Sequence, residues 1–233
     1  MSNDSFHFKR FTICHDRCAM KVGTDGVLLG AWGSVEGHCI LDIGTGTGLI
    51  ALMAAQRNPD ATVLGIDIDE TAVQQAQENI KRSPFCDRVN CQLQDVLTFH
   101  PKTPFDAILC NPPFFTEDTL PDDKGRAMAR NNRSLPFSSL IRKAASLLTD
   151  KGRLSLIVPS THAQEIVGLC LAEGLYLNRR CIVRTKASKP PRRTLMMFSS
   201  CASQTTEEQD LCLTTADGSR SASYIRLTEE FYL

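Results

Sequence analysis

The sequence lacks several features that assign a protein to a broad class. Its 26 basic and 26 acidic side chains cancel, so it has no general excess of positive charge of the kind that binds nucleic acid over a whole surface. It also has no signal peptide and no uninterrupted apolar run long enough to cross a bilayer, and we expect a cytoplasmic protein without a membrane partner. Internal repeats and low-complexity linkers are missing too, which favours a single domain over residues 1–233.

A metal motif is also lacking, although the chain contains ten cysteines. Cys14, His15 and Cys18 lie close together, but no second Cys/His pair follows at the spacing of a zinc finger, so we expect no metal. A reduced thiol within an apolar run serves as a small hydrophobic side chain. This applies to Cys39, Cys110, Cys170 and Cys181.

The chain does contain an alternation of apolar strands and helical stretches, which predicts a mostly parallel, doubly wound α/β sheet. We divide it into an N-terminal segment (1–35), this alternating core (36–200) and a C-terminal extension (201–233). Strands are expected at 40–43, 62–67, 88–95, 105–110, 152–158, 176–183 and 194–198. Helices are expected at 27–32, from 49 onward, and at 70–82, 136–148 and 162–172.

Two loops of this core have distinct compositions. The last two expected strands flank a basic loop, 184–193, and we expect them to form an antiparallel hairpin at the edge of the sheet. The stretch 116–133 is polar and has no periodicity. Long loops of this kind are usually functional lids or disordered, so we expect mobility there until substrate binds.

The segment from Ile40 to Gly48 reads ILDIGTGTG and joins a buried strand to a helix. Glycines at such a turn let the backbone approach a ligand closely, and the N-terminus of the next helix presents free N–H groups. A dinucleotide site has the pattern G-x-G-x-x-G, whereas the third glycine here comes one residue early. No Lys-Ser/Thr of a P-loop follows. The turn therefore fits a nucleoside ligand without a pyrophosphate.

Acidic residues end the next two expected strands. Asp67 follows the strand 62–67, where an acid of an α/β nucleotide site accepts hydrogen bonds from ribose hydroxyls. Asp69 is the competitor for this role, or else caps the helix that starts at Glu70. Asp95 ends the third strand, where it can meet an adenine amino group or serve as a helix cap or turn residue.

The tetrapeptide Asn111-Pro112-Pro113-Phe114 directly follows the apolar strand 105–110. The Asn111 side-chain oxygen and the Pro112 carbonyl can both accept hydrogen bonds from one planar amino group. The proline rings fix φ, so the two acceptors are held in place. Phe114 offers a flat face on which a flipped base can stack. An ordinary proline turn, with Asn111 in an Asx-turn, is the alternative.

These motifs, in this order and spacing, resemble the class I S-adenosylmethionine-dependent methyltransferases that modify amino groups. The N-terminus adds a closer resemblance, because FHFKRF at 6–11 and HDRCAMKVGTDGVLLGAW at 15–32 are similar to the bacterial tRNA-valine adenine-N6 methyltransferase family. The likeness extends over nearly the whole chain, to the terminal Phe-Tyr-Leu. Phe114 departs from it, since many members have tyrosine at this position.

The resemblance implies S-adenosyl-L-methionine as cofactor and transfer of its methyl group to the adenine immediately 3′ of the anticodon, with the tRNA anticodon stem-loop as partner. In related enzymes the segment around Thr24 lies beside the methionine end of the cofactor, although Asp25 equally suits a helix cap. The implied cofactor-binding residues are Lys21, Thr24, Asp25, Asp42, Gly44, Gly46, Gly48, Asp67 and Asp95. The implied catalytic residues are Asn111, Pro112, Pro113 and Phe114.

Basic residues gather in clusters, although the net charge is zero. Such clusters can hold an RNA backbone, while an ordinary solvated face is the alternative. The candidate RNA contacts are Lys9, Arg10, Arg126, Arg130, Arg133, Lys189, Arg192 and Arg193. The proline turn also serves methyltransferases of rRNA guanine N2 and of protein glutamine N5. A non-catalytic RNA-binding scaffold is a third alternative.

Overall fold

The computed structural model describes residues 4–18, 21–113 and 135–233. A two-stranded antiparallel ribbon lies near the N-terminus and consists of β1 (Ser5–His7) and β2 (Thr12–Cys14). The strands of the main sheet are β3 (Cys39–Ile43), β4 (Thr62–Asp67), β5 (Val89–Leu93), β6 (Phe105–Cys110), β7 (Leu148–Pro159), β8 (Tyr176–Arg184), β9 (Arg193–Ser199) and β10 (Glu207–Cys212).

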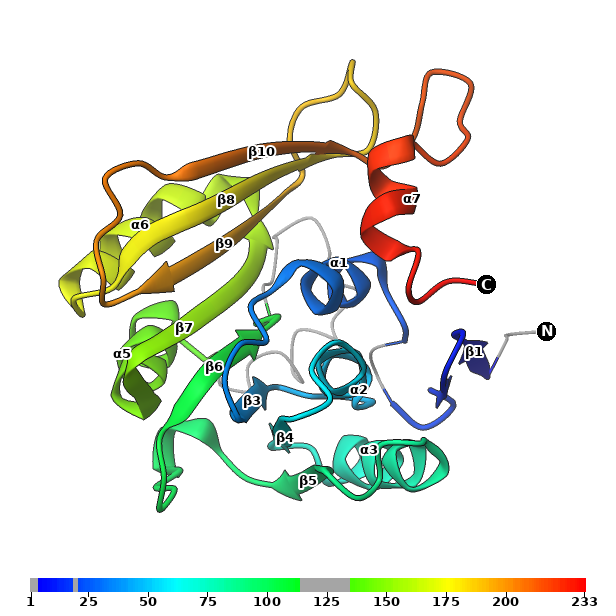
Figure 1. Cartoon of the computed structure of the whole chain (residues 1–233), viewed down its shortest axis with the longest axis vertical. Coiled ribbons are helices and arrows are strands. Elements are labelled where there is room, and N and C mark those ends of the chain that lie inside the picture. Colours follow the sequence, from blue (N-terminus) through cyan, green and yellow to red (C-terminus); the bar gives the residue numbers. More distant parts are fainter. Residues whose placement is uncertain (1–3, 19–20, 114–134) are drawn as a thin grey trace, which may run out of the picture.

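Helices cover both faces of the main sheet, with α1, α2 and α3 on one face and α5 and α6 on the other (Figure 1). The helices are α1 (Thr24–Trp32), α2 (Leu49–Arg57), α3 (Glu70–Arg82), α5 (Phe137–Leu147), α6 (Ala163–Ala172) and α7 (Ala222–Thr228), with the 3₁₀ turns η1 (Val96–Thr98) and η3 (Ser160–His162). The predicted α/β architecture is confirmed.

Within the described residues the strand order is β10-β8-β9-β7-β6-β3-β4-β5. The chain winds outward from β3 through β4 to β5, then returns to β6 on the other side of β3 and winds outward again through β7. All these neighbours are parallel, so their carboxyl ends meet at one edge of the sheet. The reversal between β3 and β6 is the position at which open α/β sheets bind ligands.

The predicted antiparallel hairpin is present, because β8 and β9 pair in antiparallel register and β9 pairs likewise with β7. The hairpin does not form the edge of the sheet. The edge strand is β10, which is not among the strands expected from the sequence and which lies outside β8 and runs parallel to it. Part of the C-terminal extension is therefore an edge strand of the main sheet.

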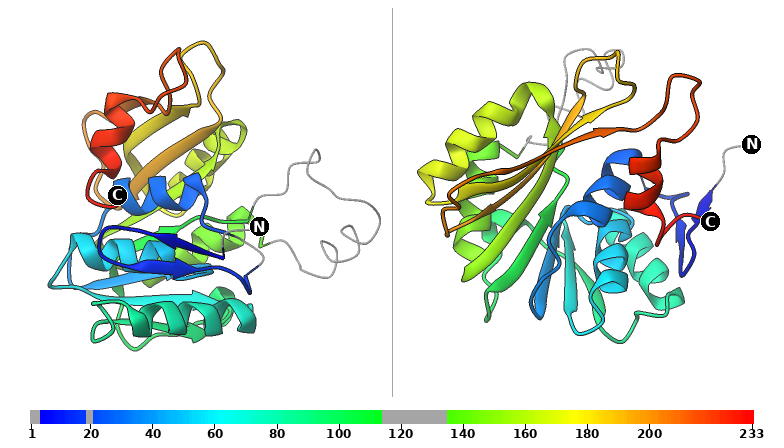
Figure 2. Two further views of the ribbon diagram at one scale, coloured as in Figure 1. Left: turned by 90° about the vertical axis from the view of Figure 1, so that its right-hand side faces the viewer. Right: turned by 45° about the horizontal axis from the view of Figure 1, so that its top comes forward.

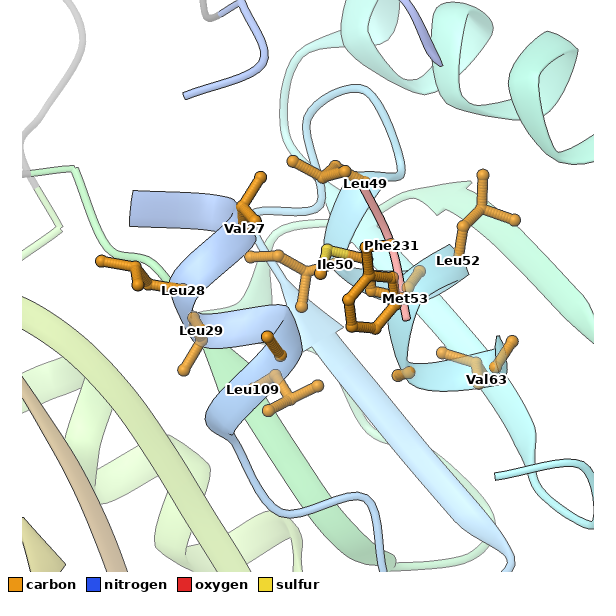
Figure 3. Close-up of a cluster of buried hydrophobic side chains, with 14 of the residues drawn as sticks. Val27, Leu28, Leu29, Leu49, Ile50, Leu52, Met53, Val63, Leu109 and Phe231 are labelled. Atoms are coloured by element: carbon orange, nitrogen blue, oxygen red, sulfur yellow. The ribbon is translucent and has the colours of Figure 1, made fainter. Parts of the chain in front are cut away.

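The two ends of the chain meet on the face covered by α1 and α2. The β1–β2 ribbon packs against α3, and α7 packs against α1 (Figure 2). The Lys9 N–H donates to the Phe231 carbonyl at 2.8 Å, and the rings of Phe8 and Tyr232 stack with centroids 5.9 Å apart. Phe231 itself is 2% exposed and joins the apolar cluster between α1 and α2 that includes Met53 (Figure 3).

Replacing Phe231 with alanine tests how much this closure contributes to stability. We expect Phe231→Ala to lower the free energy of unfolding by about 3–5 kcal/mol, because it removes a buried ring and leaves a cavity. Chemical denaturation followed by circular dichroism measures this change. Leu233→Ala is the control, since Leu233 is 85% exposed and its loss should change the value by less than about 0.5 kcal/mol. Equal effects of the two substitutions would contradict the assignment of Phe231 to the core.

Candidate functional site

The glycine turn between β3 and α2 has the backbone conformation that its sequence predicts. Gly44, Gly46 and Gly48 have φ angles of 70°, 54° and 82°, in the left-handed region that side-chain-bearing residues rarely adopt. A Cβ atom at Gly44 or Gly46 would meet nothing within 4 Å, so the turn faces open space. At Gly48 it would lie 3.4 Å from the Ala76 Cβ, and this glycine instead permits α2 to start close to α3. We call residues 44–48 the glycine loop.

Hydrogen bonds tie the glycine loop to the end of β4. The N–H groups of Gly44 and Thr45 both donate to the Ile66 carbonyl, at 2.9 and 3.0 Å. The Gly46 N–H donates to Asp67 Oδ2 at 2.9 Å. Gly65 lets Thr45 approach β4, because a Cβ there would lie 2.7 Å from Thr45 Oγ1. The loop and the predicted ribose acid are thereby held side by side.

Asp42 lies beneath the glycine loop and is fully buried. Its Oδ2 accepts hydrogen bonds from Thr45 Oγ1 at 2.6 Å and from the Ala51 N–H at 3.1 Å. Burial raises the pKa of Asp42 to about 7, although both hydrogen bonds act to lower it. Oδ1 has no hydrogen-bond donor among the described residues. Asp42 therefore shapes the loop and the start of α2 from below.

The other strand-end acids divide their roles. Asp69 caps α3 by accepting hydrogen bonds from Thr71 N and Ala72 N, and it is therefore the capping residue, while Asp67 faces the loop. Asp95 accepts a hydrogen bond from the Leu97 N–H at 2.9 Å and so caps η1. It is exposed at the same edge of the sheet, and a contact with a bound base stays a prediction.

Exposed aliphatic side chains, which are not among the predicted site residues, flank these acids. Ile68, Leu93 and Leu97 are 66%, 53% and 41% exposed, and they follow or end strands β4 and β5. Large aliphatic side chains close to carboxylates at the ligand-binding edge suit the flat face of a nucleobase. The only sequence signal is their proximity to Asp67 and Asp95, and this does not reveal exposure.

Asn111 lies at the carboxyl end of β6, next to the reversal point of the sheet. Its Oδ1 is buried and has no hydrogen-bond donor among the described residues. A buried acceptor without a partner is unfavourable, so this oxygen indicates a ligand that brings its own donor. Pro112 is buried and Pro113 exposed, whereas Phe114 lies outside the described residues.

An open cavity of about 690 Å³ joins these elements. Of the predicted cofactor residues, its wall includes Lys21, Thr24, Asp25, Gly44 and Gly46. Asp42, Gly48, Asp67 and Asp95 lie outside this wall. The remaining predicted site residues that line it are Asn111, Pro112, Pro113, Arg192 and Arg193.

Asp25 does not cap α1, because the N-cap residue is Gly23 and no side chain caps that end. Asp25 Oδ2 instead accepts a hydrogen bond from Arg193 Nε at 2.7 Å, and both side chains are about one-quarter exposed. This ion pair joins the first turn of α1 to the start of β9 across the cavity rim. Arg193, a predicted RNA contact, thus has an ion-pair partner within the protein.

Asn79 connects the N-terminal segment to the glycine loop. It is 1% exposed, and its Oδ1 accepts from the Cys14 N–H at 2.9 Å. Its Nδ2 donates to the carbonyl oxygens of Cys14 and of Thr47, each at 2.9 Å. The end of β2 and the glycine loop are therefore linked by one side-chain amide. In the sequence, nothing distinguishes Asn79 from the other polar residues of α3.

Three arginines of β8 have partners within the protein, so they are less available to RNA than their positive charges in the sequence suggest. Arg179 stacks on Trp32 at 3.8 Å, Arg180 pairs with Glu208, and Arg184 with Asp210 of β10.

Among the predicted RNA contacts, Lys9 donates to the Glu229 carbonyl at 2.5 Å and Arg10 lies over the Phe85 ring at 5.2 Å. Lys189 and Arg192 are exposed. Arg126, Arg130 and Arg133 lie outside the described residues, as does the stretch 116–133.

Two further expectations concern metals and membranes. No group of three or more His, Cys, Asp or Glu side chains among residues 4–18, 21–113 and 135–233 is placed to hold a metal ion. Over the same residues, no helix is both long and apolar enough to cross a membrane.

Comparison with known proteins identifies the family. The sequence profile described as "methyltransferase small domain" matches residues 22–169, more than half of the chain. A tRNA1(Val) (adenine(37)-N6)-methyltransferase from Bacteroides thetaiotaomicron is 44% identical over 100% of this chain and 99% of its own length. The chain belongs to this methyltransferase family. Other members are similar over comparable lengths, among them proteins of the same name from Tolumonas auensis (44% identity; 100% of this chain, 98% of theirs) and Pseudoalteromonas translucida (40%; 98% and 98%).

Solved structures show the same methyltransferase fold at low sequence identity. A predicted O-methyltransferase from Agrobacterium tumefaciens has a TM-score of 0.67 at 19% identity, covering 89% of this chain and 96% of that one. A glycopeptide N-methyltransferase, solved as a complex with (S)-adenosyl-L-methionine, has a TM-score of 0.55 at 10% identity, covering 78% and 90%. These likenesses concern the fold.

The buried Asp42 carboxyl makes stability depend on pH. Its folded pKa of about 7 lies above the ordinary value of 3.8, so the folded protein binds more protons in between. Stability contributed by this group therefore falls as pH rises from about 4 to about 7, by about 1.4 kcal/mol per pH unit at most. We expect the Asp42→Asn variant not to show this decrease in stability between about pH 4 and about pH 7, because the asparagine side chain does not ionise.

Thermal and chemical denaturation of both proteins across this pH range test the effect. The difference in unfolding free energy should shift in favour of Asp42→Asn by about 3–4 kcal/mol between the acidic and the neutral end of the window. Measurements at about pH 3 or below serve as the control, because the Asp42 carboxyl is then mostly neutral in the folded and in the unfolded protein, as an asparagine side chain always is. A difference that does not vary with pH would contradict the assigned burial of charge.

Proposed function

We propose that the protein transfers a methyl group from S-adenosyl-L-methionine to N6 of adenine 37 in tRNA1(Val). The full-length relatives at 44% identity have this activity by name. The observation that carries the proposal is the buried Asn111 Oδ1, to which no described residue donates a hydrogen bond, at a cavity that also includes Gly44 and Gly46 of the glycine loop.

The residues present fit the cofactor. The glycine loop leaves open space where a side chain would stand, which suits close approach of a ligand to the backbone. Asp67 lies at the end of β4 beside the loop, where its carboxylate can accept hydrogen bonds from ribose hydroxyls. The exposed Ile68 and Leu97 offer apolar surface for an adenine ring, with Asp95 nearby as a polar partner for its amino group.

The methionine end of the cofactor is expected near the start of α1, where Lys21, Thr24 and Asp25 line the cavity. Asp25 is held by Arg193, so its position is fixed before any ligand binds. These assignments are proposals that rest on the shared cavity wall.

The cofactor supplies an activated methyl group, so the protein's task is to position the accepting nitrogen. The N6 lone pair of adenine is delocalised into the ring and is a weak nucleophile. Hydrogen bonds from the amino group to Asn111 Oδ1 and to the Pro112 carbonyl would orient the nitrogen and favour the positive charge that develops on it. Holding the reactants in one geometry contributes several kcal/mol to the rate. No general base is required, because the methylated ammonium is acidic and releases its proton readily.

Phe114 completes the proposed catalytic turn as the stacking surface for the base, although it lies outside the described residues. The target base must leave its stack, or be splayed in a loop, to reach Asn111 and Phe114.

Because the proposed substrate is a tRNA, we place the protein in the cytoplasm and expect the anticodon stem-loop to be its partner. We also propose that residues 1–233 form one domain, since both apolar clusters pack on the same sheet. A protein that binds no metal is a further part of this proposal.

Other substrates remain as alternatives to be tested. The proline turn also suits guanine N2 in rRNA and glutamine N5 in proteins, since both are planar nitrogens. The N-terminal resemblance and the names of the full-length relatives favour tRNA. A non-catalytic scaffold is disfavoured, because the glycine loop, Asp67 and Asn111 are all in place.

The first experiment is transfer of a labelled methyl group to total tRNA from cells that lack this gene. Nucleoside mass spectrometry should then find N6-methyladenosine beside the anticodon of a valine tRNA. Label in rRNA or in a protein, with none in tRNA, would contradict the substrate and leave the methyltransferase activity standing. Cofactor binding with no transfer to any of these would favour the scaffold.

Substitution of Asn111 tests the catalytic turn. We expect Asn111→Ala to lower kcat for methyl transfer by about 10²–10³-fold, because one acceptor for the amino group is lost. Cofactor affinity, measured by calorimetry, should stay within about twofold, because the glycine loop and Asp67 are unchanged. Asn90→Ala, at an exposed position in β5, is the control and should leave both values unchanged. An equal loss of cofactor affinity and of kcat in Asn111→Ala would contradict the assigned role.

A further inference from the structure

One side of the cavity is built by residues beyond the segment that matches the general methyltransferase profile. That segment ends at residue 169, whereas the cavity wall also includes residues of the β8–β9 hairpin and of the loop after β10. We define the far wall as Val183, Thr185, Arg192 and Leu213. The glycine loop and Asn111 belong to the matched segment. The cavity is therefore lined both by the matched segment and by strands and loops that follow it.

Backbone hydrogen bonds hold the far wall together. β10 pairs in parallel with β8 up to the pair Cys212–Arg184. The pairing continues beyond the strands, since the Leu213 N–H donates to the Arg184 carbonyl at 2.9 Å and the Thr214 N–H to the Thr185 carbonyl at 3.0 Å. The two loops project together from one end of the sheet (Figures 1 and 2). Leu213 thus reaches the cavity because β10 is present.

The opposite end of the basic loop is fixed as well. The Arg192 N–H donates to the Val183 carbonyl at 2.9 Å, which closes the hairpin at its base. The next residue, Arg193, is held by Asp25 of α1. The far wall is therefore anchored both to the edge strand β10 and to the helix that follows the N-terminal segment.

The chemistry of the far wall suits a nucleotide. Leu213 is half-buried and offers an apolar surface for the flat face of a base, while Val183 is buried in the core beneath the wall. Thr185 and Arg192 are exposed and bring a hydroxyl group and a guanidinium to the same wall. A guanidinium matches the geometry of a phosphate through paired N–H donors. Proteins that bind single-stranded RNA combine an apolar surface, which contacts a base, with a cation, which contacts a phosphate.

We propose that the far wall binds the target nucleotide of the RNA, with its base against Leu213 and its phosphate at Arg192. This rests on the proposed function and deepens it, because it assigns substrate recognition to named residues that follow the matched segment. Asn111 lines the same cavity as the far wall, so a base held there has its amino group within the same space as Asn111 Oδ1. The cofactor occupies the side of the glycine loop.

Filling the cavity from the far wall tests the proposal. Thr185→Trp places a large ring at an exposed position of the wall, so the fold should be retained. We expect kcat/KM for tRNA to fall by about 50-fold or more, while the dissociation constant of S-adenosylmethionine changes by less than about twofold. Thr205→Trp is the matched control. Thr205 is exposed and lies before the amino end of β10, whereas Thr185 follows the carboxyl end of the parallel strand β8. Retained tRNA activity in Thr185→Trp would overturn the proposal, and so would an equal loss of cofactor binding.

The phosphate contact is tested separately by salt dependence. Arg192→Ala should weaken tRNA binding and reduce the slope of log Kd against log salt concentration by about 1, as expected for one lost phosphate contact. Lys151→Ala removes one exposed cation near the start of β7 and should leave the slope unchanged. Leu213→Ala should raise KM for tRNA with the slope unchanged, since it removes apolar surface only. An unchanged slope in Arg192→Ala would overturn the assignment of Arg192.

The wild-type assay separates this proposal from the proposed function. If wild-type protein methylates rRNA in place of tRNA, the tRNA assignment fails, and the same variants are measured with rRNA. Loss of rRNA methylation in Thr185→Trp, but not in Thr205→Trp, would then support the far wall. If wild-type protein methylates only a polypeptide, both proposals fail, because the far wall is assigned to a nucleotide.

Discussion

The hydrogen bonds between the glycine loop and the end of β4 are the constraint on which the site depends. The Ile66 carbonyl accepts two loop N–H groups and Asp67 accepts a third, so the loop cannot shift without breaking contacts with the neighbouring strand. This attachment fixes where α2 begins and which N–H groups stay open for a ligand. Asp42 fastens the same loop from below. Because β3 and β6 are adjacent and parallel, the position of Asn111 relative to the loop follows from the sheet register.

Much of this arrangement follows from the sequence. The apolar runs of β3, β4 and β6 are bounded by glycine, acidic and proline residues, and parallel pairing brings their ends together. Strand β10 was not predictable in the same way, because Glu207–Cys212 has mostly polar side chains. Its pairing depends on the backbone of β8 and on ion pairs such as Arg180–Glu208 and Arg184–Asp210. The position of β10 is therefore determined by its contacts with β8 and not by an apolar pattern of its own.

The function of individual polar residues was harder to infer than the fold. Asp67 and Asp69 are separated by one residue, yet one faces the glycine loop and the other caps α3. Arginines of the β8–β9 hairpin differ in their partners: Arg179 stacks on the Trp32 indole, Arg180 pairs with Glu208 of β10, and Arg192 lines the cavity. Asn79 joins the glycine loop to β2 through three hydrogen bonds, but only the folded chain brings these segments together. Charge and polarity along the chain therefore indicate candidates, and the partners decide their roles.

The packing of the N-terminal ribbon on Tyr232 has a consequence for the order of folding. Phe6 and Phe8 contact the Tyr232 ring, although these residues are far apart in the sequence. Contacts between distant parts of a chain form slowly, because the entropy of closing a long loop opposes them. The hydrogen bonds of Asn79 to Cys14 and Thr47 join residues that are much closer in sequence. We therefore expect the link between the ribbon and the glycine loop to form before the ribbon packs on Tyr232.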